Sequence, residues 1–298
     1  MTLDDVTSSE NQQLLIEFPD HIQVYIKRED LLHAQISGNK FRKLKYNLIK
    51  ARQFNQRTLL TFGGAYSNHI AAVAAAAHKF DFNSIGIIRG EELADKIDPN
   101  PTLHKAQQYG MQLHFVSRAD YRRKTESEFI QQLIEQYGEF YLIPEGGSNH
   151  LAVQGCAEIL TTHDRQQFDY VCCAVGTGGT LAGIIESSAP SQTVLGFAAL
   201  KGDFLQAQIQ QWTAKTNWRL ISDYHCGGYA KTTPALLHFI QQFYQCTGIP
   251  LEPIYTGKLM FSLLDLIQRG YFAPHSRILV IHTGGLQGNL SPRFSIFN

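Results

Sequence analysis

The sequence lacks the features that mark secreted, zinc-binding or membrane-spanning chains. Its five cysteines form no C-x-x-C pair, so neither a disulfide framework nor a zinc ribbon is indicated, and we expect no bound metal. No apolar run approaches the ~20 residues that a membrane helix needs. The first residues, MTLDDVTSSENQQ, are acidic and polar, unlike a signal peptide. We therefore expect a cytoplasmic protein with no membrane partner.

An excess of one charge is also missing. Lys plus Arg and Asp plus Glu both number 26, so electrostatics give no reason to expect nucleic acid as a partner. Hydrophobic residues make up 44% of the chain and charged residues 17%, which is typical of a chain that folds around a packed core. The 298 residues predict one large domain or two of ordinary size.

Short apolar runs alternate with longer amphipathic segments along the chain. Strands are expected at Ile22–Lys27, Thr58–Thr61, Ser84–Ile88, Gln112–Val116, Phe140–Ile143, Tyr170–Val175, Val194–Ala198 and Arg277–His282. Helices are expected at Asn39–Arg52, Asn68–Lys79, Ser127–Tyr137, Leu151–Leu160, Thr232–Tyr244 and Leu259–Arg269. This alternation predicts an α/β fold of mostly parallel sheets with helices on both faces.

Four glycine-bearing turns follow expected strands, at Gly63-Gly64, Gly146-Gly147, Gly176–Thr180 and Gly284-Gly285. In open α/β sheets ligands bind beyond the carboxyl ends of the strands, so these turns should converge on one crevice.

The turn Gly176-Thr177-Gly178-Gly179-Thr180 joins an expected strand to an expected helix. Backbone N–H groups at a helix start, beside two hydroxyls, suit a phosphate. The turn is neither a Walker A loop nor a dinucleotide fingerprint, which favours a mononucleotide or a cofactor monophosphate. A tight turn without a ligand is the alternative.

Lys40 follows a Ser37-Gly38-Asn39 turn at an expected helix start. The helix dipole disfavours a cation there and lowers the pKa of its amine, which a Schiff-base lysine needs. An ordinary basic surface position is the alternative.

The segment Gly63–His69, GGAYSNH, contains Ser67, Asn68 and His69 at a second expected helix start. These side chains offer a hydroxyl, an amide and a proton carrier. Either Ser67 or Asn68 could instead cap the helix, and both roles are compatible. His69 alone is equally explained as a polar helix residue.

Together these segments resemble the fold-type II pyridoxal-phosphate enzymes, specifically the 1-aminocyclopropane-1-carboxylate (ACC) deaminase/D-cysteine desulfhydrase family. The resemblance runs from IKRED through SGNKFRKL, GGAYSNH, IPEGGSNHLAVQG and GTGGTLAG to YTGK and HTGG. It implies a pyridoxal 5'-phosphate cofactor, a small amino-acid substrate and a homodimer. It also implies a large cofactor domain (residues 1–44 and 151–298) and a small domain (45–150) that closes on the substrate.

The resemblance also implies roles for individual residues. Lys40 matches the lysine that holds the cofactor, Asn68 the residue beside its ring oxygen, and Gly176 to Thr180 the phosphate loop. Ser67, Tyr255 and Tyr229 match catalytic hydroxyls, while Tyr66 and His69 flank the substrate. Tyr66 stands where many relatives have Gln, and Ala71-Ala72 where they have polar residues.

Thr256 and Thr283 indicate which reaction the site favours, because ACC deaminases of this family have Glu and Leu there. A glutamate near the pyridine nitrogen would keep the ring protonated and strengthen it as an electron sink, whereas a threonine would not. The weaker sink suffices for elimination of a thiolate from Cβ, as in D-cysteine desulfhydration. ACC ring opening, β-replacement by an added nucleophile and a non-catalytic sensor are the alternatives.

Overall fold

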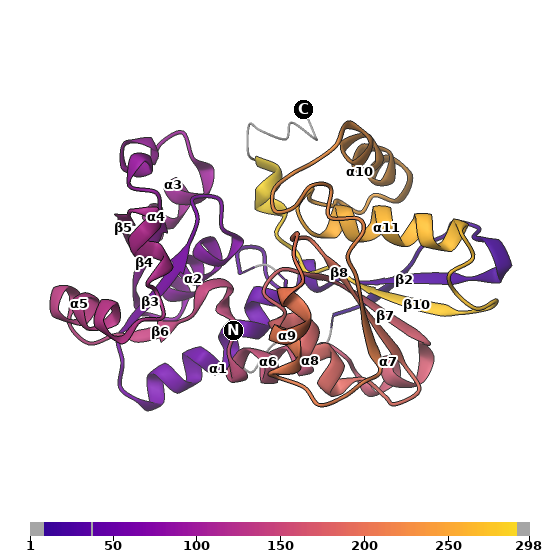
Figure 1. Ribbon diagram of the computed structural model, residues 1–298, viewed down its shortest axis with the longest axis horizontal. Helices are drawn as coiled ribbons and strands as arrows, with labels where there is room; N and C mark the ends of the chain where they lie inside the picture. The colour runs from indigo at the N-terminus through magenta and orange to yellow at the C-terminus, as the bar shows by residue number, and fades with distance from the viewer. Residues whose placement is uncertain (1–8, 37, 291–298) are drawn as a thin grey trace.

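Two separate β-sheets organise the chain, one in each half of the molecule (Figure 1). The computed structural model describes residues 9–36 and 38–290; Ser37 of the expected turn lies outside them. The large sheet has the order β1 (Asn11–Gln13), β2 (Gln23–Lys27), β10 (Arg277–Ile281), β7 (Tyr170–Val175), β8 (Thr193–Ala198) and β9 (Trp218–Ile221). The small sheet has the order β5 (Met111–Val116), β4 (Asn83–Arg89), β3 (Thr58–Gly63) and β6 (Tyr141–Ile143).

All eight expected strands are present, and every strand pair except one is parallel. The exception is β1, which runs antiparallel to β2 at the edge of the large sheet. The sequence reasoning missed β1 because its residues, Asn-Gln-Gln, carry no hydrophobic alternation. It also missed β9, a short strand at the opposite edge. The predicted α/β class with mostly parallel sheets is confirmed.

Eleven α-helices connect the strands in the described part of the chain. They are α1 (Asn39–Gln53), α2 (Asn68–Lys79), α3 (Pro101–Gln108), α4 (Arg118–Arg122), α5 (Ser127–Tyr137), α6 (His150–Ala157), α7 (Thr162–Gln167), α8 (Gly179–Ser187), α9 (Phe204–Gln210), α10 (Pro234–Thr247) and α11 (Thr256–Gln268). The six expected helices are confirmed: α2 and α5 have the predicted bounds, and the other four have shifted ends. Within residues 9–36 and 38–290, no helix combines the length and apolar character that crossing a membrane requires.

Helix α11 begins three residues before the predicted start, for a reason that affects the site. The buried Glu252 carboxylate accepts hydrogen bonds from the N–H groups of Ile254, Tyr255 and Thr256 at 2.6–2.8 Å. A carboxylate at a helix start satisfies otherwise unpaired N–H groups and is favoured by the helix dipole. This cap therefore fixes the backbone of Tyr255 and Thr256 in place.

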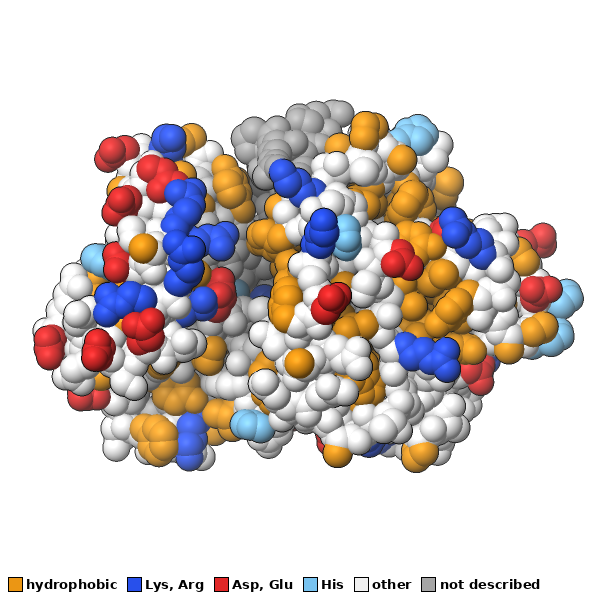
Figure 2. Space-filling view, viewed as in Figure 1, with side chains coloured by type: hydrophobic (Ala, Val, Ile, Leu, Met, Phe, Trp, Pro, Cys, Tyr) orange, Lys and Arg blue, Asp and Glu red, His pale blue; other side chains and the backbone are white. Residues whose placement is uncertain are grey.

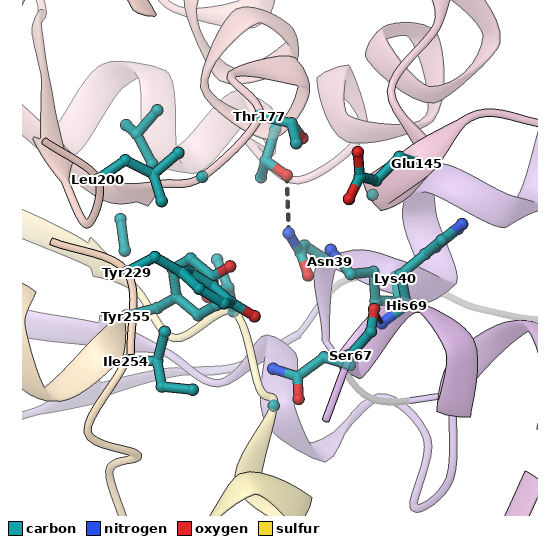
Figure 3. A pocket seen from close by; sticks show the side chains of 18 of the residues that line it. Asn39, Lys40, Ser67, His69, Glu145, Thr177, Leu200, Tyr229, Ile254 and Tyr255 are labelled. Atoms are coloured by element: carbon teal, nitrogen blue, oxygen red, sulfur yellow. Dashed lines mark hydrogen bonds between the residues drawn. The ribbon is translucent and has the colours of Figure 1, made fainter. Parts of the chain in front are cut away.

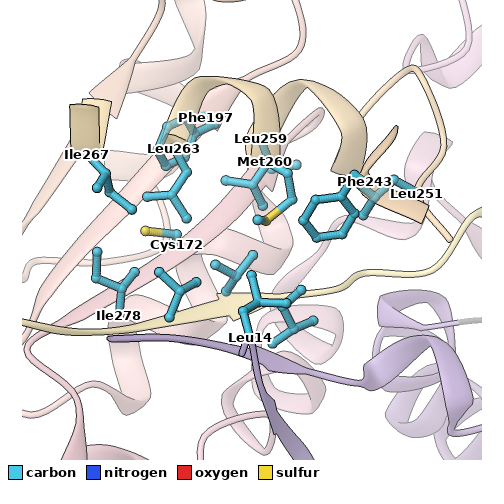
Figure 4. Packing of buried hydrophobic residues seen from close by; sticks show 14 of the residues in the cluster. Leu14, Cys172, Phe197, Phe243, Leu251, Leu259, Met260, Leu263, Ile267 and Ile278 are labelled. Atoms are coloured by element: carbon cyan, nitrogen blue, oxygen red, sulfur yellow. The ribbon is translucent and has the colours of Figure 1, made fainter. Parts of the chain in front are cut away.

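Helices cover both faces of the large sheet. Along β7, Cys172 and Ala174 pack into the core beneath α10 and α11, while Val171, Cys173 and Val175 pack into the core beneath α8. This alternation follows from the two-residue period of a strand. Figure 4 shows the first of these cores, where Leu259, Met260 and Leu263 of α11 lie over Cys172 and Ile278.

The small sheet is likewise buried on both faces. Leu59 and Ile88 face the core formed with α1, α2 and α3, whereas Leu60, Phe62 and Ile87 face α4 and α5. The strands of this sheet all lie between residues 58 and 143. The division into domains at residues 45 and 150 stays a prediction.

Candidate active site

A cavity of about 720 Å³ lies beyond the carboxyl ends of strands from both sheets. Its wall includes Gly64 after β3, Gly146 after β6, Gly176 after β7 and Gly284 after β10. The predicted convergence of the four glycine turns is therefore confirmed. The volume lies within the range of roughly 300–1,000 Å³ that small-molecule and cofactor sites occupy. In Figure 2 the surface is hollowed between the two halves of the molecule.

Lys40 is the second residue of α1 and lines the cavity. The start of this helix is held against the end of β10, because the Asn39 N–H donates to the carbonyl of Thr283 at 3.2 Å. Gly38 has a φ of +58°, and a Cβ at that position would lie 1.9 Å from the same carbonyl oxygen. Only glycine allows so close an approach. The Asn39 amide also donates to Thr180 Oγ1 at 2.7 Å, which connects the turn before Lys40 to the Gly176–Thr180 loop.

The pKa of Lys40 is lowered to about 7. Burial is the largest cause, and the positive charge of Lys43 is the second. The predicted direction of the shift is confirmed, although the causes are not the helix dipole from which it was inferred. Near neutral pH a substantial fraction of the amine is therefore unprotonated and nucleophilic.

Lys43 is a site residue that the sequence reasoning did not identify. It lies three residues after Lys40 on the same face of α1, a spacing that would have revealed it. Its buried amine donates to the Gly146 carbonyl and to Ser148 Oγ, both at 2.8 Å, and lies 3.4 Å from Thr177 Oγ1. A cation thus stands beside the Gly176–Thr180 loop.

This loop opens toward the cavity at the start of α8. Gly176, Thr177, Gly178 and Thr180 line the wall, and no described side chain caps the helix start at Gly178. Gly178 has a φ of +78°, a left-handed conformation that favours glycine. Uncapped N–H groups, two hydroxyls and the Lys43 amine together suit a phosphate. Gly179 lies outside the wall and packs near Ser148 instead.

Ser67 acts as the N-cap of α2, which confirms the predicted cap, and it also lines the cavity, where its catalytic role stays a prediction. Its Oγ accepts from the N–H groups of His69 at 3.2 Å and Ile70 at 3.4 Å. The hydroxyl proton is then left to donate into the cavity. Tyr66 lines the same wall with about half of its surface exposed.

Asn68 and His69 are both held by neighbours. Gln287 Nε2 donates to Asn68 Oδ1 at 2.8 Å, which turns the Asn68 amide group toward Gly285 and the cavity. His69 is buried, its Nε2 lies 2.8 Å from Thr61 Oγ1, and its pKa is held well below the usual value by burial and by Lys40 and Lys43. The imidazole is therefore neutral near pH 7.

Tyr229 and Tyr255 face these groups from the opposite wall (Figure 3). Their ring centroids are 6.4 Å apart. Burial raises the pKa of both hydroxyls, so each keeps its proton at neutral pH. In Figure 3 Lys40, Ser67 and His69 lie on one side of an open space, and the two tyrosines on the other.

The two threonines used to distinguish reactions occupy different places. Thr283 lines the cavity. Thr256 does not: it is buried behind Tyr255, and its hydroxyl lies 3.1 Å from the Glu252 carboxylate. Thr256 thus contacts the capping carboxylate of α11 rather than the cavity.

Fold and cavity together match a fold-type II pyridoxal-phosphate enzyme: a lysine amine of lowered pKa, a glycine loop that suits a phosphate and an amide line one cavity between the two sheets. The family model described as "Pyridoxal-phosphate dependent enzyme" matches residues 13–284. The chain therefore belongs to the pyridoxal-phosphate dependent enzyme family.

Comparison with individual proteins shows which members of the family this chain resembles. The chain is 32% identical to the bifunctional D-cysteine desulfhydrase/1-aminocyclopropane-1-carboxylate deaminase, mitochondrial, of Arabidopsis thaliana, over 91% of this chain and 74% of that protein. It is 27% identical to the D-cysteine desulfhydrase of Klebsiella pneumoniae, over 92% and 90%. A crystal structure of an ACC deaminase homologue superimposes with a TM-score of 0.81 at 28% identity, over 95% of this chain and 91% of that one. The predicted family is confirmed.

Proposed function

We propose that this enzyme performs β-elimination on a small amino acid, converting D-cysteine and one water to pyruvate, ammonia and sulfide. The observation that carries the proposal is Lys40: an amine with a pKa of about 7 lies in a cavity opposite two protonated tyrosines. The names of the Arabidopsis and Klebsiella relatives support the substrate.

Each wall of the cavity has its own task. The Gly176–Thr180 loop and Lys43 hold the cofactor's phosphate, and Asn68 donates to its ring oxygen. When bound, pyridoxal phosphate supplies an aldehyde carbon that joins an amine and a ring that takes up electrons from Cα. The start of α2, with the Ser67 hydroxyl, orients the substrate carboxylate.

Lys40, Tyr229 and Tyr255 transfer the protons of the reaction. The unprotonated Lys40 amine accepts the α-proton of the substrate, and its pKa near the working pH suits a general base. Tyr255 and Tyr229 keep their hydroxyl protons and donate them toward the leaving sulfur. The neutral His69 adds no competing positive charge at this point.

Deamination of ACC to 2-oxobutyrate and ammonia is the second candidate, because the Arabidopsis relative carries both names and the solved structure is an ACC deaminase homologue. ACC has no α-proton, so Ser67 or a tyrosine would have to begin the reaction. We favour elimination because the unprotonated Lys40 amine in the cavity can accept an α-proton, which D-cysteine has and ACC lacks. A homodimer and a cytoplasmic location stay predictions.

An absorbance spectrum of the purified protein tests the proposal, followed by separate additions of D-cysteine, L-cysteine and ACC. We expect a visible cofactor band, and pyruvate and sulfide in equal amounts from D-cysteine. Lys40→Ala should lose the band and turnover together. Release of 2-oxobutyrate from ACC would favour ACC deamination over elimination as the function. A fully active Lys40→Ala variant would overturn the assignment of Lys40 as the cofactor-binding lysine.

A further inference from the structure

Arg89 is a cavity residue that elimination from D-cysteine leaves without a role. It is the last residue of β4, so it lies at the carboxyl end of a small-sheet strand, beside the turn that contains Ser67. A Cβ on Gly64 would be 3.6 Å from the Arg89 Nη2 atom, which places the guanidinium directly against that turn. The charge is thus next to the substrate end of the cavity.

Neighbouring side chains hold the Arg89 guanidinium in position. The guanidinium carbon lies 5.6 Å from the centroid of the Tyr121 ring, a cation–π distance. Tyr121 is buried, and its hydroxyl donates to Glu145 at 2.7 Å. The ring is therefore fixed and presents a face on which the arginine rests.

No carboxylate of residues 9–36 and 38–290 lies within ion-pair distance of Arg89. Glu145 is the only acidic side chain in the described cavity wall, and it is engaged by Tyr121 and by Lys124 at 3.4 Å. Lys231, on the loop before α10, adds a second cation from the other side. Figure 2 shows Lys and Arg side chains gathered over the α4 region of the same half.

The other cations and donors of the cavity already have anions to bind. Lys43 and the start of α8 suit the cofactor phosphate, and Ser67 at the start of α2 suits the substrate's α-carboxylate. A substrate with a neutral thiol on Cβ would offer the Arg89 guanidinium no anionic partner. An anionic group on that substituent would instead form a charge-assisted pair with it.

We propose that the substrate carries a second acidic group on its β-substituent and that Arg89 binds this group. The proposal rests on the elimination proposed above. In the reaction the Cβ–S bond breaks, the sulfur takes the electron pair and a proton, and water converts the three-carbon remainder to pyruvate and ammonium. The acidic group leaves with the sulfur; D-cysteine can undergo the same elimination but has no such group for Arg89 to bind.

Two thioethers of nearly equal shape form the test: S-carboxymethylcysteine, which is anionic on its substituent, and its neutral amide, S-carbamoylmethylcysteine, each as D and L enantiomers. The wild type should show a kcat/KM at least roughly 10-fold higher for the acid than for the amide, the size of one charge-assisted hydrogen bond. Arg89→Gln should abolish the preference and Arg89→Lys should restore part of it. O-Phosphoserine distinguishes a carboxylate from a phosphate requirement.

Arg122→Gln is the matched control, because Arg122 is exposed on α4 in the same half and does not line the cavity. It removes one positive charge from the same region and should leave the preference unchanged. A wild type that eliminates from D-cysteine but treats acid and amide alike would overturn the role of Arg89 while sparing elimination.

Calorimetric titration with each thioether measures binding to Arg89 independently of whether elimination occurs. If no thiolate is released but the acid binds at least tenfold more tightly, dependent on Arg89, then elimination fails and the anion site stands. Equal binding of acid and amide to the wild type and to Arg89→Gln would overturn the inference.

Discussion

Lys40 and Lys43 lie three residues apart on one face of α1, and the charge of the second helps to lower the pKa of the first to about 7. Two lysines on one helical turn, with Lys43 fully buried, would be costly in an ordinary core. Here the amine of Lys43 is held by Gly146 and Ser148, which leaves Lys40 to face the cavity. We therefore expect Lys43 to bind an anion and Lys40 to react.

The capture of pyridoxal phosphate by the cofactor-free protein should depend on pH through Lys40. A folded pKa of about 7, below the ordinary lysine value of 10.5, means that the reactive unprotonated amine is mostly present above pH 7 and is lost as the pH falls below it. The capture rate should therefore rise with a midpoint near pH 7. Stopped-flow absorbance measures it. A midpoint near 10 would contradict the burial of this amine.

Lys43→Met should move that midpoint upward, because it removes a positive charge that lowers the pKa of Lys40. It should also weaken cofactor binding by roughly tenfold or more, since a charge-assisted contact to the phosphate is lost. Equilibrium dialysis gives the affinity. Lys50→Met is the control, because Lys50 lies in the last turn of α1 and does not line the cavity. It should change neither the midpoint nor the affinity.

Gly38→Ala should displace the start of α1 and with it Lys40. The added Cβ would meet the Thr283 carbonyl at 1.9 Å, and the φ of +58° is itself unfavourable for alanine. Gly270→Ala is the matched control, because its φ is +69° and nothing lies within 4 Å of the added atom. Gly270→Ala should lose about 1 kcal/mol from backbone strain, and Gly38→Ala more, because its ψ of −134° lies outside the left-handed helical region. Only Gly38→Ala should lose further stability and cofactor affinity, measured by thermal unfolding and absorbance titration.

Ser67→Ala should remove both a helix cap and a cavity hydroxyl. Loss of the cap alone costs about 1 kcal/mol of unfolding free energy. Asn100→Ala removes a comparable cap from α3, where the Asn100 side chain accepts from Thr102 and Leu103 at 2.9 and 3.0 Å. The two variants should unfold at similar denaturant concentrations. If kcat/KM fell equally in both, Ser67 would have no role beyond capping.

Thr256→Glu, the change toward the deaminase pattern, should destabilise this protein at neutral pH. The Thr256 hydroxyl lies 3.1 Å from the Glu252 carboxylate, whose pKa burial already raises. A second carboxylate there would raise both pKa values further, because like charges disfavour ionisation. A carboxyl group whose pKa is higher in the folded than in the unfolded protein destabilises the fold at a pH where it must be ionised. Protonation removes this cost, so the loss of unfolding free energy in Thr256→Glu should shrink as the pH falls toward 4. Thr256→Val, measured alongside at each pH, should show no such recovery.

The sequence predicted the parallel strands and most of the helices well because both kinds of element bury apolar residues with a regular period. It also predicted that Lys40, Ser67 and the Gly176–Thr180 loop lie at one cavity, since glycine turns after strands mark where backbone approaches a ligand. It did not reveal that Thr256 points at Glu252, because a buried hydrogen bond four residues apart has no periodic signal. Arg89 and Glu145 were missed because only the folded sheet brings the ends of β4 and β6 to one wall.

The order of strands in the large sheet has a consequence for how the protein is made. Strand β10, the last strand of the chain, inserts between β2 and β7, and its end supplies the Thr283 carbonyl that anchors the start of α1. During synthesis the reactive lysine therefore emerges early, while its anchor emerges last. A chain stalled before β10 would expose the unpaired edges of β2 and β7, which are prone to aggregate, and would hold no formed cavity. Completion of translation and acquisition of the cofactor should thus coincide in time.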